Sequence, residues 1–141
     1  MSTRFCVHFG TAFLGMMILI CPGAASDGKV RSRFAGSYTG KYIYHGLNAE
    51  NQQEGVSSTT IDEKGYVNGE ATNTTLNQSL KVTGTIDEDG RARMVYEFPT
   101  ATYTGTGTYS KTRKGTIIGT LTQWSGMRAM GVIELELTPK P

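Results

Sequence analysis

Hydrophobic and polar residues alternate with a period of two along most of the chain beyond residue 34. The alternation is clearest over residues 76–86, where Leu80 and Val82 share one face and Lys81 and Thr83 the other. Successive side chains of a strand point to opposite sides, so this pattern indicates half-buried strands. No segment of the same region shows a convincing helical period.

The pattern predicts eight strands, over residues 36–45, 55–62, 66–73, 76–86, 91–98, 100–110, 115–124 and 128–138. Short turns ending in glycine separate several of them, as three- to five-residue hairpin loops require. Two of these turns lie in a local repeat, TIDEKG at 60–65 and TIDEDG at 85–90, which predicts the same hairpin twice. The longest connection is the polar stretch 46–54.

Sequential strands joined by short loops usually pair with their neighbours, and long parallel crossovers are absent. Such a meander buries its apolar side and removes its exposed edges by closing on itself. We therefore predict an all-β fold, an antiparallel meander of about eight strands closed into a small barrel over residues 35–138. A two-layer β-sandwich is the alternative.

The chain before the barrel has the order of a secretory signal peptide. Residues 1–4 are weakly basic, residues 5–21 are mostly apolar, and CPGAAS follows. This predicts a signal peptide over residues 1–25, with cleavage after Ala25 or after Ser26, and a flexible lead-in over residues 26–34. A lipoprotein signal acylated at Cys21 and a retained anchor remain alternatives. The predicted location is secreted or periplasmic.

Cleavage removes both cysteines, since Cys6 and Cys21 lie in the signal segment. The mature chain then has no disulfide and no thiolate ligand or nucleophile. Losing Arg4 leaves 13 basic against 12 acidic side chains, which gives no indication of nucleic-acid binding. His45 is the only remaining histidine, too few for a zinc site or a convincing triad.

Acidic residues give no clear catalytic pattern either. Glu97 and Glu134 fall on the polar faces of their strands, and the 87–89 acidic turn lacks the later glutamate of an EF-hand. We therefore predict a non-enzymatic protein with no catalytic residue, metal site or cofactor. Asn73 and Asn77 both fit the N-glycosylation pattern, which matters only in a eukaryotic secretory pathway.

The stretch TATYTGTGTYS at 100–110 places threonine at every second position, as expected for the solvent side of a strand. The residues between them then face inward, and their glycines leave room between tyrosines. That room is filled by Trp124 or a neighbouring tyrosine, or stays open as a pocket. The predicted ligand-binding residues are Tyr38, Tyr42, Tyr44, Tyr96, Tyr103, Gly105, Gly107, Tyr109 and Trp124.

A family resemblance rests on Gly36-Ser37-Tyr38 at the start of the first strand. A signal peptide followed by an eight-strand meander resembles the calycin-type barrels, the lipocalins and avidins, which open with Gly-x-Trp. The resemblance implies a barrel that holds a ligand, with a basic residue near the last strand against the aromatic ring, for which Arg128 is the candidate. Trp124 is the only tryptophan, so biotin binding is not implied.

The sequence thus predicts an exported binding protein for a small apolar or aromatic ligand, without nucleic acid as a partner and without a membrane span after cleavage. The alternative is an envelope or extracellular protein that contacts a protein or polysaccharide partner through its loops. Ice or mineral binding by the threonine row is a third hypothesis, which the expected twist of a meander sheet disfavours.

Overall fold

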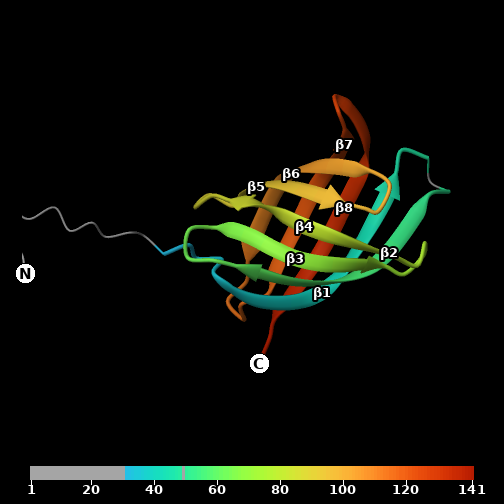
Figure 1. Cartoon of the computed structure of the whole chain (residues 1–141). Coiled ribbons are helices and arrows are strands. Elements are labelled where there is room, and N and C mark those ends of the chain that lie inside the picture. The colour runs from blue at the N-terminus through green and yellow to red at the C-terminus, as the bar shows by residue number, and fades with distance from the viewer. Residues whose placement is uncertain (1–30, 49) are drawn as a thin grey trace, which may run out of the picture.

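Eight strands follow one another around a closed barrel in the computed structural model, which describes residues 31–48 and 50–141 (Figure 1). Every strand pairs antiparallel with the next, and the last pairs with the first, which excludes the sandwich and confirms the predicted barrel. The strands are β1 (Gly36–Gly46), β2 (Gln52–Ile61), β3 (Tyr66–Asn73), β4 (Gln78–Ile86), β5 (Arg91–Glu97), β6 (Thr102–Lys111), β7 (Ile117–Ser125) and β8 (Arg128–Pro139).

Within the described residues no helix is long and apolar enough to cross a membrane. The predicted signal peptide, with Cys21 and the cleavage residues Ala25 and Ser26, lies outside the described residues. The predicted loop 46–54 is shorter than expected, because β2 already begins at Gln52 and pairs there with His45.

One end of the barrel, here called the closed end, carries the β2–β3, β4–β5 and β6–β7 turns. Two of these turns are the repeated sequence, and they are built alike, as predicted. Asp62 Oδ1 accepts hydrogen bonds from the backbone of Lys64 and Tyr66, and Asp87 Oδ1 accepts the equivalent pair. Gly65 and Gly90 then adopt φ values of +86° and +87°, which suit glycine.

The segment before β1 seals this closed end. Phe34, the last residue of the expected lead-in, is fully buried, and its carbonyl accepts a 2.8 Å hydrogen bond from the Tyr38 hydroxyl. Lys111 Nζ lies 5.6 Å from the Tyr38 ring centroid and donates to the Arg33 carbonyl and to the Tyr38 hydroxyl, each at 3.0 Å. The core therefore begins at Phe34, and Lys111 ties the incoming chain to the barrel wall.

Lys111 also replaces the residue that the sequence suggested as the cation against Tyr38. Arg128 lies at the first position of β8, beside the β7–β8 hairpin, at the end of the barrel opposite Tyr38. The Arg128 prediction was therefore wrong. Lys111 was overlooked because the predicted sixth strand ended at residue 110, which left Lys111 outside the strand whose inward face it continues.

Candidate functional site

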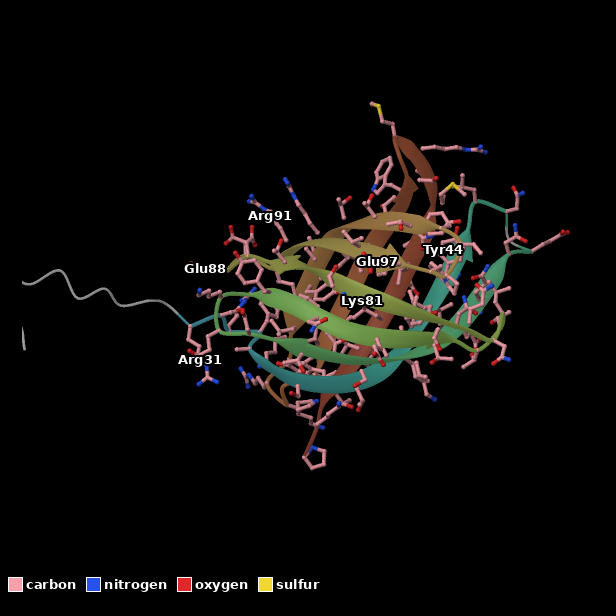
Figure 2. The ribbon with its side chains drawn as sticks, in the orientation of Figure 1. Arg31, Tyr44, Lys81, Glu88, Arg91 and Glu97 are labelled. Carbon is pink, nitrogen blue, oxygen red and sulfur yellow. The ribbon has the colours of Figure 1, made fainter. Side chains whose placement is uncertain are left out.

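The half of the interior away from Phe34 is hollow. It holds a cavity of about 530 Å³, whose lining includes residues of the β1–β2 and β5–β6 connections, so it opens at the end opposite Phe34. We call this the open end. In Figure 2, Tyr44 lies toward this end, whereas Arg31 and Glu88 lie toward the other. The β7–β8 hairpin extends beyond the barrel wall (Figure 1).

Five of the nine sequence-predicted ligand residues line the cavity: Tyr42, Tyr44, Tyr96, Tyr103 and Tyr109. The alternation of β1, β5 and β6 turns all five inward, as the pattern predicted. Tyr38, Gly105 and Gly107 do not line it. Tyr38 belongs to the closed end, and the two glycines lie beneath neighbouring side chains or backbone.

Trp124, the ninth residue, does not line the cavity either. It pairs in register with Thr104, whose side chain belongs to the exposed row, and its indole Nε1 donates a 3.0 Å hydrogen bond to Thr106 Oγ1. The sequence left Trp124, a neighbouring tyrosine or an open pocket as alternatives for the room beside Gly105 and Gly107, and Trp124 does not enter it. A neighbouring tyrosine, Tyr96, covers Gly105 instead.

The tyrosine rings lie against glycines of adjacent strands. A Cβ added at Gly105 would come within 2.7 Å of the Tyr96 ring, and one at Gly119 within 2.6 Å of the Tyr109 ring. The Tyr42 ring covers Gly55 of β2 in the same way. Glycine thus lets each ring lie flat along the wall, as aromatic residues do when they cover strand glycines. Rings held at the wall leave the barrel axis open.

Two tyrosine hydroxyls in this region have no hydrogen-bond partner although they are buried, those of Tyr42 and Tyr96. Burial raises the pKa of Tyr42 to about 12, and it raises the pKa of Tyr96 further, with an additional contribution from Tyr42. The surroundings of these hydroxyls therefore disfavour negative charge. Both oxygens have almost no accessible surface, so the two tyrosines present their rings to the cavity rather than a free hydroxyl.

A small polar strip lies on β2 and β3. Asn73 is almost fully buried, and its Nδ2 donates a 2.7 Å hydrogen bond to Gln53 Oε1. On β2, the Ser57 and Thr59 hydroxyls share a 2.9 Å hydrogen bond. Gln53, Ser57, Thr59 and Asn73 all line the cavity. Asn73 Oδ1 also accepts a 2.9 Å hydrogen bond from the backbone N–H of Leu76. Of the two glycosylation candidates, Asn73 is buried and Asn77 is exposed, so Asn77 is the more accessible.

A β-bulge brings an arginine to the cavity mouth. Gln123 pairs with Gly131 and Trp124 with Ala129, so Met130 is an extra residue on β8. Simple alternation counted back from Ile133 assigns Arg128 to the outer face of β8. The extra residue shifts that alternation by one position, so Arg128 faces inward and lines the cavity. Bulges commonly redirect side chains in this way.

The sequence reasoning missed the aliphatic part of the lining, which includes Val67, Leu80, Val82, Ile133 and Leu135. Their alternation was recognised, but it was interpreted as core. Whether such a face is packed or lines a hollow depends on the residues across the barrel, which a pattern along one strand does not report. The inward glycines were the usable signal, since each removes a side chain from the interior.

Chemically, the site is an apolar and aromatic cavity with a small polar strip on β2 and β3 and one cation at its mouth. No group of three or more His, Cys, Asp or Glu residues within 31–48 and 50–141 is placed to hold a metal ion. Comparison with family models, curated proteins and solved structures gives no match to this chain.

Proposed function

We propose that this protein is an exported, non-catalytic carrier that binds a small apolar or aromatic molecule inside the barrel. The observation that supports the proposal best is the cavity of about 530 Å³, lined by tyrosines and aliphatic side chains. Its volume lies within the range of about 300–1,000 Å³ that is usual for small-molecule sites. Export rests on the apolar segment and small residues of positions 1–25.

The resemblance of Gly36-Ser37-Tyr38 to the opening motif of calycin-type barrels agrees with this proposal. The aromatic residue of that motif position is buried at the closed end, under a basic side chain. The carrier proposal itself depends on the cavity and not on this likeness.

A matched pair of variants on β2 tests the carrier proposal. Ser57 lines the cavity and Ser58, its neighbour, points outward, so Ser57→Phe and Ser58→Phe add the same group to opposite faces. We expect Ser57→Phe to weaken binding of the apolar fluorophore N-phenyl-1-naphthylamine by at least about tenfold, equivalent to about 1.4 kcal/mol. Ser58→Phe should bind as the unmodified barrel does.

Circular dichroism of both variants establishes that they are folded, and fluorescence titration gives the two affinities. Equal affinities for folded Ser57→Phe and Ser58→Phe would place the fluorophore on the surface, and no binding to the unmodified barrel would reject the carrier proposal.

A second candidate, contact with a protein or polysaccharide partner through the loops, has a separate observation behind it. Leu47 in the β1–β2 loop is 68% exposed and Met127 at the β7–β8 tip is 98% exposed. Both loops lie at the open end, where Leu47 N donates to the Met130 carbonyl. If these tips contact a partner, Met127→Ser, which lies outside the cavity lining, should weaken its capture from envelope extract while N-phenyl-1-naphthylamine still binds.

A further inference from the structure

Resting on the proposed carrier function, we propose that the ligand is an amphiphile with a single anionic group, such as a carboxylate or sulfonate, which Arg128 holds at the mouth while the apolar body lies inside the barrel. The first observation behind this proposal is the distribution of charge along the cavity lining. Among residues 31–48 and 50–141, Arg128 is the only charged residue that lines the cavity, and no carboxylate does.

The position of Arg128 follows from a specific local structure. The bulge at Met130 interrupts the pairing of β7 with β8, and without it Arg128 would lie on the outer face. Arg128 instead pairs in register with Ser125 and joins the lining of the mouth. Among the described residues it takes part in none of the ion pairs, which join Arg31 to Glu63, His45 to Glu134 and Arg91 to Asp89. Its guanidinium therefore keeps its donors for another anion.

The inside of the cavity sets the orientation of the ligand. Deeper residues such as Val67 and Leu137 offer no charge, and burial already disfavours the charged form of Tyr42. An anionic group placed there would lose its hydration without gaining a cation. At the mouth, the same group keeps part of its hydration and meets Arg128. The anionic end thus stays outward, and the apolar end enters.

Two fluorophores that share a skeleton separate the charge from the apolar body. N-phenyl-1-naphthylamine is neutral, and 8-anilinonaphthalene-1-sulfonate carries the same rings with one sulfonate. We expect Arg128→Gln to weaken binding of the sulfonate by about twofold to fivefold, as for an exposed charge pair. Binding of the neutral fluorophore should stay unchanged, and Arg128→Lys should retain part of the preference.

Arg113→Gln is the control, because Arg113 lies in the exposed β6–β7 turn at the closed end and its loss changes the net charge equally. It should leave both affinities as they are. The contribution of Arg128 should also shrink at high ionic strength, since salt screens exposed charges.

Three results overturn the proposal. If Arg128→Gln weakens both fluorophores alike, or weakens neither, the anion does not depend on Arg128, while the carrier function stands. If Arg113→Gln has the same effect as Arg128→Gln, the preference reflects net charge alone. If neither fluorophore binds the unmodified barrel, the carrier function fails and the anionic ligand fails with it.

Discussion

The two halves of the barrel interior use tyrosine in opposite ways. At the closed end Tyr38 is fully buried, donates to the Phe34 carbonyl and accepts from Lys111, so its polar group is satisfied by the protein itself. In the open half, the hydroxyls of Tyr42 and Tyr96 are buried without a partner. A buried polar group without a partner costs free energy, so these two hydroxyls lower the stability of the open half instead of adding to it. The closed half thus stabilises the barrel, and the open half keeps a space.

The largest difference between the halves should appear when the same residue is truncated in each. Phe34→Ala leaves a cavity in the solid half and should lower the free energy of unfolding by about 3–5 kcal/mol. Phe98 is only partly buried at the open end, where its ring meets Tyr103 edge to face with centroids 5.7 Å apart. Phe98→Ala should therefore lose about 1–2 kcal/mol, from its smaller burial and that single ring contact.

Urea denaturation of the two variants measures both losses. Similar losses would mean that the open half is packed as tightly as the closed half, and the distinction between a solid and a hollow half would be wrong.

The second test concerns the glycines that keep the tyrosine rings at the wall. The three atoms nearest to a Cβ at Gly105 belong to the Tyr96 side chain, whereas those nearest to a Cβ at Gly107 belong to the backbone of Thr120 and Leu121. Each Gly→Ala change should destabilise by about 1–3 kcal/mol through overpacking. In a Tyr96→Leu background, the Gly105→Ala loss should shrink by about 1 kcal/mol or more, while the Gly107→Ala loss should persist.

A double-mutant cycle by chemical denaturation gives both coupling energies. If Gly105→Ala costs the same with and without the Tyr96 ring, the ring does not lie on that glycine, and the account of how the cavity stays open must change.

Most of the fold was predictable from the sequence, because alternation reports which face of each strand is inward. All eight strands were placed, and the two acidic turns were recognised as equivalent because Asp62 and Asp87 occupy the same place in a repeat. Tyr103 and Tyr109 were assigned to the interior by the same alternation, and they line the cavity. Each of these features is set by residues close together in the chain.

The parts of the site that were missed depend on pairing between strands. Arg128 precedes a bulge, and an extra residue on β8 is invisible until its register with β7 is known. Trp124 is different, because alternation along β7 from Ile117 and Leu121 already places it on the outer face. Alternation continued through the bulge assigns Arg128 to the wrong face. The hollow likewise depends on which ring lies against which glycine across a strand pair, such as Tyr42 on Gly55. No pattern within one strand contains that information.

A third difference appears only at high pH. Burial raises the pKa of Tyr42, Tyr96 and Tyr109, all of which line the cavity. Above pH 10 these three tyrosines therefore stay protonated in the folded barrel, whereas they lose their protons in the unfolded chain. Stability that is fully present below pH 10 should therefore decline as the pH rises toward about 12, where Tyr42 titrates, and beyond.

Urea denaturation across this range measures the decline, and Tyr42→Phe should make it shallower because it removes one such proton. If the decline has the same slope with and without Tyr42, the Tyr42 hydroxyl is solvated, and the open half is less secluded than its geometry indicates.

The smallest effect is expected on the outer surface of the open half, where the threonine row lies. Thr106 accepts the hydrogen bond from Trp124, and the next threonine of the row, Thr108, pairs in register with Thr120 instead. Thr106→Val should lower the free energy of unfolding by no more than about 1 kcal/mol, since the bond is exposed to water, and Thr108→Val by less. Neither should alter binding of N-phenyl-1-naphthylamine. Because Trp124 is the single tryptophan, its emission reports the Thr106 change directly. Altered binding in Thr106→Val would connect the outer face to the cavity and reject the view that the hollow depends on the inner residues alone.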